Sequence, residues 1–325
     1  MIPTNQIKKQ LNNTLEETDF TKLGKKYKGK VRDNYILGDK RIIITTDRIS
    51  AFDRVLGTIP FKGQVLNQMT CFWFEKTKQI AKNHLIEDID PNVVVAKQCK
   101  PMPVEMVVRG YITGVTKTSA WYNYNNGVRN FCGNLSPEGM KKDQRFDEPI
   151  LTPSTKAEKG GHDESVSKKD ILKRGIVSED DFDTMEKASF SLFEFGSRLL
   201  EKQGLILVDT KYEFGKDNDE NIVLIDEMHT PDSSRFWFLD TYEELFERGE
   251  EQRKLDKEYV RKWLADQGYL GDGEPPKLLD DVRIEAAKRY IKAYELITGM
   301  DFRVSKKTIM ERIEKNLINV GYLKE

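Results

Sequence analysis

The sequence predicts an α+β fold of two lobes, and three observations support this. The first hundred residues are rich in strand patterns, the segment Lys100-Pro101-Met102-Pro103 is stiff, and the remainder mixes strand and helix patterns. Because two prolines remove backbone donors, we expect this segment to end a strand ladder and to separate the lobes. The division gives a β-rich lobe of residues 1–102 and a larger α+β lobe of residues 103–325.

In the first lobe, a hairpin precedes a helix and a further strand. Gly38-Asp39-Lys40 predicts a turn between strands at 28–37 and 41–46. Apolar residues recur at helical spacing over 61–82, and the β-branched run at 92–97 is typical of a strand. The lobe is therefore expected to contain one sheet with a helix packed on it.

The second lobe begins with a strand at 104–113 and continues into a charged segment, 137–174, that is expected to be a long polar loop. Ser178 and Asp181 predict the cap of a helix that ends near Gly204. Strands at 205–214 and 222–227 then form a hairpin. From residue 240 onward the pattern is helical, and Ser305 is expected to open the last helix, which Gly321 closes.

Composition and charge exclude several classes of protein. The chain has 53 basic and 54 acidic residues, a net charge of −1, so no global basic field exists to hold a nucleic acid. No apolar run approaches the roughly 18 residues of a membrane span, and the first residues lack the apolar stretch of a signal peptide. Cys71, Cys99 and Cys132 lie far apart, which favours reduced thiols in a cytoplasmic protein.

The strand at 205–214 carries the strongest chemical signal. Alternation places Asp209, Lys211 and Glu213 on one face and apolar residues on the other. The partner strand ends at a second carboxylate pair, Asp226 and Glu227. Carboxylates beside a lysine suit a hard cation next to a phosphate, since Mg²⁺ takes one or two carboxylates together with phosphate oxygens and water. A solvated strand face with cross-strand ion pairs fits the spacing equally well.

Residues 24–30 (GKKYKGK) come close to a phosphate-binding loop, but Val31 stands where Ser or Thr would bind Mg²⁺, and a strand follows. The segment is still a glycine hairpin with Lys30 and Arg32 on one face, able to contact phosphate oxygens. Two exposed basic residues on a sheet edge are the plainer interpretation.

Two further segments gather polar chemistry. Residues 152–164 combine hydroxyls, lysines, carboxylates and an imidazole in one loop, and Arg235 lies in a turn between serines and aromatics, where its fork can grip a carboxylate or phosphate. Arg109 follows a strand in the same way. With three histidines and no zinc spacing in the sequence, histidine-based metal chemistry is not expected.

Taken together, these segments resemble the SAICAR synthetase family. The resemblance runs in order from about residue 20 to 240, and the residues after 240 match the longer members only loosely. The matching segments are 29–33 (GKVRD), 47–53 (DRISAFD), 105–114 (EMVVRGYITG), 149–164 (PILTPSTKAEKGGHDE), 207–215 (LVDTKYEFG) and 226–237 (DEMHTPDSSRFW).

The resemblance implies a reaction of purine biosynthesis in which ATP, carboxyaminoimidazole ribotide (CAIR) and L-aspartate give SAICAR, ADP and phosphate. It implies a β-rich N-terminal lobe over a larger α+β lobe, with ATP in the cleft between them. The cofactors would be ATP and Mg²⁺, and the partners would be small molecules, with neither nucleic acid nor membrane. The oligomeric state does not follow from it.

Site residues are also implied by the resemblance, position by position. The catalytic group would be Lys211, Lys156 and Asp209. The nucleotide would contact Gly29, Lys30, Val31 and Arg32, with Lys100 and Met102 as the hinge against adenine, and Glu213 and Asp226 would hold Mg²⁺. The substrates would contact Arg109, Thr118, Ser119, His162, Asp163, Asp232, Ser234 and Arg235.

One departure and one alternative accompany the resemblance. Some family members place a serine directly after the glycine at position 114, whereas this chain has Val115, so we expect Thr118 or Ser119 to supply the hydroxyl. The alternative is another phosphotransferase of this architecture, similar to inositol-polyphosphate kinases, whose acceptor is a hydroxyl. We also expect residues 152–164 to act as a lid that orders when the ligands bind.

Overall fold

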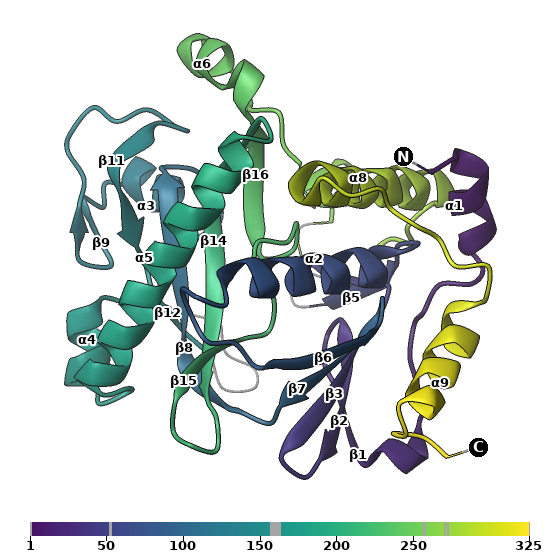
Figure 1. Ribbon diagram of the computed structural model, residues 1–325. Coiled ribbons are helices and arrows are strands. Elements are labelled where there is room, and N and C mark those ends of the chain that lie inside the picture. Colours follow the sequence, from purple (N-terminus) through teal and green to yellow (C-terminus); the bar gives the residue numbers. More distant parts are fainter. Residues whose placement is uncertain are drawn as a thin grey trace.

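The computed structural model describes residues 2–51, 54–156, 164–255, 258–269, 271 and 273–324. It mixes helices and strands in the α+β manner that the sequence predicts (Figure 1). The strands are β1 (Lys25–Lys28), β2 (Arg32–Leu37), β3 (Lys40–Thr45), β4 (Arg48–Ala51), β5 (Arg54–Thr58), β6 (Leu85–Asp90), β7 (Val93–Lys97), β8 (Lys100–Tyr111), β9 (Asn130–Phe131), β10 (Asn134–Leu135), β11 (Arg145–Leu151), β12 (Ser154–Thr155), β13 (Glu164–Ser165), β14 (Leu205–Lys216), β15 (Ile222–Ile225) and β16 (Ser234–Phe238). The helices are α1 (Thr4–Gln10), the 3₁₀ turn η1 (Thr21–Leu23), α2 (Lys62–Thr77), α3 (Ala120–Asn125), α4 (Lys168–Lys173), α5 (Glu179–Glu201), α6 (Leu239–Arg248), α7 (Glu258–Asp266), α8 (Asp280–Thr298) and α9 (Ile309–Asn319).

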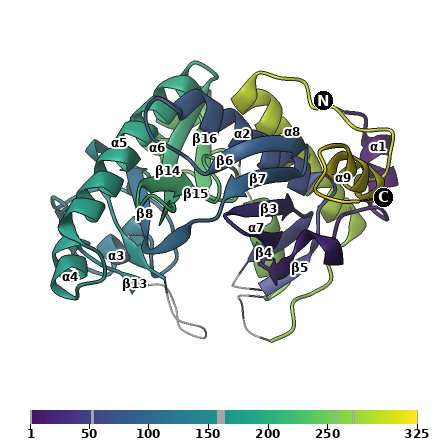
Figure 2. The same ribbon diagram turned by 60° about the horizontal axis from the view of Figure 1, so that its bottom comes forward.

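A five-stranded antiparallel sheet forms the N-terminal part, in the order β1-β2-β3-β7-β6. Side chains of β3 alternate between its faces: Ile42 and Ile44 pack with Ile313 of α9, while Ile43 packs near Cys71 of α2. Figure 2 shows β3, β7 and β6 side by side in this order, with α9 at one end of the molecule. The helix at the C-terminus therefore closes the core of the N-terminal sheet.

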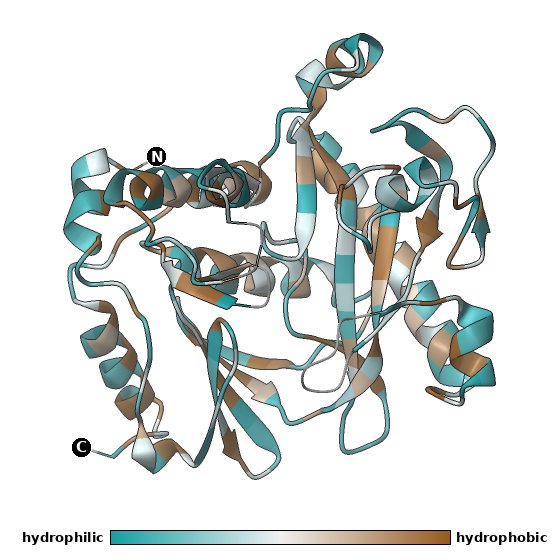
Figure 3. Ribbon diagram, turned by 180° about the vertical axis from the view of Figure 1, so that it is seen from behind, coloured by the Kyte–Doolittle hydropathy of each residue, from teal (hydrophilic) through white to brown (hydrophobic). Residues whose placement is uncertain are grey.

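A seven-stranded sheet forms the second part, with β8 and β14 as its long central pair. Its path is β13-β12-β8-β14-β15, and β11 and β16 pair with β8 and β14 respectively. Hydropathy alternates along these strands (Figure 3), because one face packs against α5 while the other carries the polar residues described below.

The sequence analysis expected the proline segment to end a strand ladder, and this expectation is wrong. β8 begins at Lys100 and pairs through it, Lys100 opposite Lys216 and Pro101 opposite Gly215. The carbonyl of Pro103 accepts from Lys156 N at 3.1 Å, on the side away from β14. A register shift separates the Glu213–Glu105 pair from the Gly215–Pro101 pair, so β8 continues its pairing with β14 across the prolines through a bulge.

The expectation of a single polar loop over 137–174 is also wrong. The described part of this segment contains β11, β12, β13 and α4. β11 and β12 extend the large sheet through their pairing with β8, which the dense charges of the segment hid.

The helix predictions are largely confirmed. Ser178 caps α5 by accepting a hydrogen bond from Asp181 N, and α2 covers most of 61–82. The last helix begins later than expected: its cap is Thr308, in a capping box with Glu311, and not Ser305. Its apolar face, with Ile313 at the centre, is buried as predicted.

Two sequence-based exclusions can be compared with the structure. No helix among the described residues is both long and apolar enough to cross a membrane. Cys71, Cys99 and Cys132 are free, and burial raises the pKa of the Cys132 thiol to about 12. These thiols are therefore not reactive thiolates at neutral pH.

Candidate active site

The exposed face of β14 forms a web of alternating charges. Alternation along the strand brings Lys211 and Glu213 to the same side, and the register sets Glu105 of β8 directly opposite Glu213. Lys211 Nζ lies 2.9 Å from Glu105 Oε1 and also donates to Glu213 Oε1, while Lys156 donates to Glu213 Oε2. Two lysines and two carboxylates thus meet at one point of the sheet.

These neighbours shift the pKa values in opposite directions. Burial raises the pKa of Glu105. Burial acts on Glu213 too, but Lys211 and Lys156 outweigh it and hold the pKa of that carboxyl well below its usual range. For Lys211 burial works against the charge, whereas Glu213 and Glu105 raise the pKa well above normal. Glu213 and Lys211 are both charged near neutral pH.

A second charge pair joins the two sheets. Arg32, at the start of β2, donates to Asp226 Oδ1 and lies 3.1 Å from Glu227 Oε2. Asp226 has φ 66°, a left-handed conformation that is uncommon outside glycine and often marks functional positions. Burial, together with the nearby Glu213 and Glu227, raises the pKa of Asp226 to about 7 against the pull of Arg32.

The donor set of this region fits one kind of metal site. Among the described residues, no three His, Cys, Asp or Glu side chains converge to hold an ion by themselves. Glu213 and Asp226 nevertheless lie close enough to influence each other electrostatically, and their oxygens contact only cationic side chains in the hydrogen bonds above. This arrangement suits Mg²⁺, which takes few carboxylates and completes its shell with phosphate oxygens and water.

Two arginines and one aspartate form the next cluster. Asp209 lies opposite both Arg109 of β8 and Arg235 of β16 in the sheet register. Its two oxygens lie 3.2 Å from Arg109 Nη1 and 3.2 Å from Arg235 Nε. Arg109 is fixed further by Thr152 Oγ1, at 2.7 Å, and by the carbonyl of Thr118, at 2.9 Å. Asp209 therefore holds two guanidinium forks side by side.

These side chains line a cavity of about 180 Å³. Its wall brings together six predicted site residues and adds Arg261 of α7. The lining residues are Val107, Arg109, Asp209, Thr210, Lys211, Pro231, Asp232, Ser233, Ser234, Arg235 and Arg261. A cavity with several arginines and few apolar groups suits a ligand that carries more than one anionic group.

The sequence analysis left open whether Thr118 or Ser119 supplies the hydroxyl that a serine after Gly114 provides in some family members. The structure favours one of them. Gly114 has φ 92°, and a Cβ there would lie 2.5 Å from Ser119 Oγ and 2.7 Å from Arg235 Nη1. Ser119 Oγ is therefore adjacent to the Arg235 guanidinium, whereas Thr118 is held through its carbonyl. Ser119 is the better placed of the two hydroxyls, and a side chain at position 114 would occupy the space between the groups.

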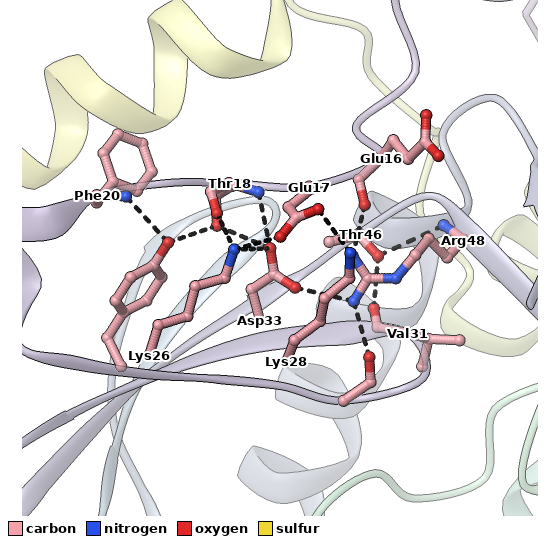
Figure 4. Close-up of polar contacts among 12 residues, drawn as sticks. Glu16, Glu17, Thr18, Phe20, Lys26, Lys28, Val31, Asp33, Thr46 and Arg48 are labelled. Atoms are coloured by element: carbon pink, nitrogen blue, oxygen red, sulfur yellow. Dashed lines mark hydrogen bonds and ion pairs between the residues drawn. The ribbon is translucent and has the colours of Figure 1, made fainter.

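The glycine hairpin before β2 is held from behind by a buried arginine (Figure 4). Arg48 donates from Nη2 to the carbonyl of Gly29 and from Nε to the carbonyl of Lys30, each at 3.0 Å. It also pairs with the buried Asp33 at 2.9 Å. Thr46 binds the carbonyl of Val31 through both its backbone N and its hydroxyl. The backbone of the hairpin is therefore fixed, so Arg32 leaves it in a defined direction.

The remaining predicted residues are distributed as follows. Met102 is buried and Lys100 is exposed at the start of β8, next to the change from one sheet to the other. Ser234 is buried, with its hydroxyl 2.7 Å from Thr210 Oγ1. His162 and Asp163 lie outside the described residues, as does most of the predicted lid.

Sequence reasoning missed four residues that the structure connects to this site. Glu105 pairs with Lys211, and Arg261 lines the cavity. Lys62 forms a buried ion pair with Asp232, and Arg48 supports the glycine hairpin. Glu105 had a signal, because it alternates with Arg109 on one strand face, but the others depend on tertiary contacts alone.

A larger groove, of about 1050 Å³, lies around α4, β10 and the residues Glu186 and Phe190 of α5. None of the predicted site residues in the described part of the chain lines it. Its three cations, Lys168, Lys169 and Arg174, are balanced by three carboxylates in the same lining, whereas the arginine-lined cavity has four cations and two carboxylates. The arginine-lined cavity is therefore the better candidate for an anionic substrate.

Comparisons of the sequence with known proteins identify one family. The model of the SAICAR synthetase family matches residues 25–276. The phosphoribosylaminoimidazole-succinocarboxamide synthase of Legionella pneumophila (strain Lens) is 49% identical over 289 residues, which cover 89% of this chain and 92% of that protein. The synthase of the same name from Bacteroides thetaiotaomicron is 48% identical over 312 residues, covering 94% of this chain and 98% of that one.

Solved structures show the same fold. The SAICAR synthase of Saccharomyces cerevisiae, in complex with SAICAR, superposes with a TM-score of 0.77 at 31% identity, over 90% of this chain and all of that one (100%). A SAICAR synthetase in complex with ADP superposes with a TM-score of 0.65 at 26% identity, over 86% of this chain and 100% of its own.

Proposed function

We propose residue roles for the reaction of the SAICAR synthetase family, to which this chain belongs. The chain is an ATP-dependent ligase of purine biosynthesis. Its substrates are ATP, CAIR and L-aspartate, and the products are SAICAR, ADP and phosphate. One observation carries the assignment of roles: a lysine–carboxylate web on β14 adjoins a cavity lined by arginines.

The chemistry requires activation of a carboxylate, because a carboxylate has no adequate leaving group. The γ-phosphoryl group of ATP passes to a carboxylate oxygen of CAIR, and ADP leaves. The amine of L-aspartate then attacks the acyl carbon and loses a proton, and phosphate leaves with the C–O bond electrons. Both steps depend chiefly on positioning and charge neutralisation.

Each cluster has a role in this scheme. Lys211 and Lys156 exchange their contacts with Glu213 for oxygens of the transferring phosphoryl group. Arg109 and Arg235, oriented by Asp209, grip anionic groups of CAIR, and Ser119 assists Arg235. Gly29–Arg32 contact the phosphates of ATP, and Lys100 and Met102 border the adenine. The remaining substrate contacts are assigned to Thr118, His162, Asp163, Asp232 and Ser234.

Mg²⁺ belongs to the proposal through the donor chemistry of Glu213 and Asp226. When bound, the cation supplies charge neutralisation to phosphate oxygens. The chain's own part is to keep Glu213 ionised by means of Lys211 and Lys156 until the ligands bind, and to orient Asp226 by means of Arg32. The proposed compartment is the cytoplasm, which the three free cysteines favour.

Measurement of ADP release with each substrate omitted in turn tests the proposal. The expected result is release that requires both CAIR and L-aspartate, with one SAICAR formed per ADP. Release that persists without an amino acid and requires a hydroxyl acceptor would instead identify a kinase of the same architecture.

A further inference from the structure

A fully buried lysine lies behind the substrate cavity. Lys62 is the first residue of α2, its side chain is 0% exposed, and its Nζ lies 2.8 Å from Oδ2 of Asp232, whose side chain is 8% exposed. An ammonium removed from water is tolerated only when it is paired, and pairing rarely repays the whole desolvation cost. The pair is therefore weak evidence for stability and calls for another explanation.

A tyrosine from the C-terminal helices completes the contact. The hydroxyl of Tyr290, on α8, donates to Asp232 Oδ1 at 2.6 Å. The ring of the same tyrosine lies 5.6 Å from Lys62 Nζ, within cation–π range. Both oxygens of Asp232 are thus engaged by side chains from two helices, and the plane of its carboxylate is fixed.

Both helices are anchored so that these side chains cannot drift. Gly63 N, next to Lys62, donates to Asp47 Oδ1 at 2.9 Å, and a Cβ at Gly63 would lie 2.3 Å from the carbonyl oxygen of Thr45. On α8, Arg283 donates to the carbonyl of Thr58 at 2.8 Å. α8 lies beside α2 in the ribbon view (Figure 1).

The fixed carboxylate is part of the cavity wall. Asp232 lines the cavity together with Arg109, Asp209 and Arg235, which all come from the central strands of the large sheet. Asp232 follows β15 in a loop, so the sheet alone does not define its orientation. The contacts of Asp232 with Lys62 of α2 and Tyr290 of α8 define the orientation of its carboxylate.

We propose that Lys62 and Tyr290 are positioning residues for Asp232, and that α8 is thereby a structural part of the substrate site. The inference rests on the proposed function, in which Asp232 contacts CAIR or L-aspartate. A carboxylate accepts hydrogen bonds, and both substrates carry an amine that donates them. Loss of either contact lets the carboxylate of Asp232 rotate, and this weakens its hydrogen bond to the substrate amine.

Tyr290→Phe is the decisive variant, because it removes one hydroxyl and keeps the ring. We expect the KM for CAIR or for L-aspartate to rise about tenfold, as for loss of a hydrogen bond to a charged group. The KM for ATP and the thermal unfolding midpoint should stay at wild-type values. Tyr294→Phe is the matched control: Tyr294 is buried on the same helix, packs against Phe302 and does not line the cavity.

Unchanged KM values for all three substrates in Tyr290→Phe would overturn the inference. So would a lower unfolding midpoint with equal changes in the three KM values, since that is the result of a purely structural role. Lys62→Met should show the same selective pattern more strongly, and if it does not fold, Tyr290→Phe decides alone. Wild-type enzyme that releases ADP without L-aspartate would instead refute the proposed function.

Discussion

Two clusters of charge in this protein differ in what their groups contact. In the first, behind the glycine hairpin, Arg48 is 2% exposed and Asp33 is 0% exposed at the side chain. In the second, on β14, Lys156 and Lys211 are 30% and 31% exposed and share Glu213. The first cluster is sealed, whereas the second is open to water.

The difference separates charges that shape the protein from charges that bind. Arg48 donates to three backbone carbonyls and one carboxylate, so it has no further donor directed at a ligand in these contacts. Lys156 and Lys211 contact only carboxylate side chains in theirs, and a phosphate oxygen can replace these at small cost. Closed pairs should therefore control stability, and open pairs should control turnover.

The largest expected effect on stability follows from breaking the closed cluster. Arg48→Met leaves the carboxylate of Asp33 buried beside one fewer cation and strands three carbonyls. We expect the free energy of unfolding to fall by about 3–5 kcal/mol, as for other broken buried pairs. Urea denaturation measures this, with Arg198→Met as control, since Arg198 is an exposed arginine of α5. A loss below about 1 kcal/mol, the range of surface pairs, would contradict the distinction.

The open cluster should respond in the opposite way. Glu213→Gln and Asp226→Asn each keep the size of the side chain and remove an anion. Turnover should fall at least about 100-fold, the effect of losing roughly 3 kcal/mol of electrostatic stabilisation, while the unfolding midpoint changes little.

The rates are measured by ADP release at saturating Mg²⁺. Glu220→Gln is the control, because Glu220 is exposed in the hairpin turn of the same strands. A variant of Glu213 or Asp226 with near-wild-type turnover would place the metal elsewhere.

Two buried histidines, His84 and His229, predict how the free energy of unfolding depends on pH. Burial lowers the pKa of both His84 and His229 from 6.5 to about 3. Each imidazole takes up a proton below about pH 6.5 in the unfolded chain but only near pH 3 in the folded protein. The contribution of each histidine to the free energy of unfolding is therefore full well above pH 6.5 and is lost as the pH falls. From pH 6.5 to 5 each histidine contributes a loss of about 2 kcal/mol.

Urea titrations at both pH values, on wild type and His84→Gln, isolate this contribution from that of carboxylates that titrate in the same window. The loss of stability between the two pH values should be about 2 kcal/mol smaller in the variant. Equal losses in the two proteins would mean that His84 is protonated in the folded state.

What the sequence predicts depends on whether the signal is periodic or tertiary. The face of β14 follows from alternation, and the cap of α5 follows from Ser178 and Asp181, because both patterns are local. The pairing of Lys62 with Asp232 joins residues from α2 and a distant loop, and no local rule marks it. Local patterns therefore identify the strand that carries the proposed site, but not the residues that orient its neighbours.

The error at Pro101 and Pro103 has a similar cause. Proline removes a donor, but whether a ladder loses a bond depends on which side of the strand that donor faces. Only the pairing of β8 with β14 on one side and β12 on the other determines this. The boundary between the two lobes at residue 102 remains a prediction.

The smallest expected effect extends the comparison to the neighbouring cluster of Arg109, Asp209 and Arg235, which is also partly exposed. Arg235→Lys keeps the charge but loses the two-pronged fork that we propose binds an anionic group together with Arg109. The KM for CAIR should rise about tenfold, equivalent to one charge-assisted hydrogen bond. The KM for ATP should not change, because Arg235 lies in the arginine-lined cavity and not at the glycine hairpin.

Arg253→Lys is the matched control, since Arg253 stacks on Phe238 at 4.4 Å and does not line that cavity. Stability of Arg235→Lys should match wild type, because the side chain of Arg235 is 26% exposed and a lysine keeps a positive charge beside Asp209. Equal increases in the KM values for CAIR and ATP would mean that Arg235 shapes the whole site, as a sealed charge does. The proposed separation of binding charges from shaping charges would then fail at Arg235.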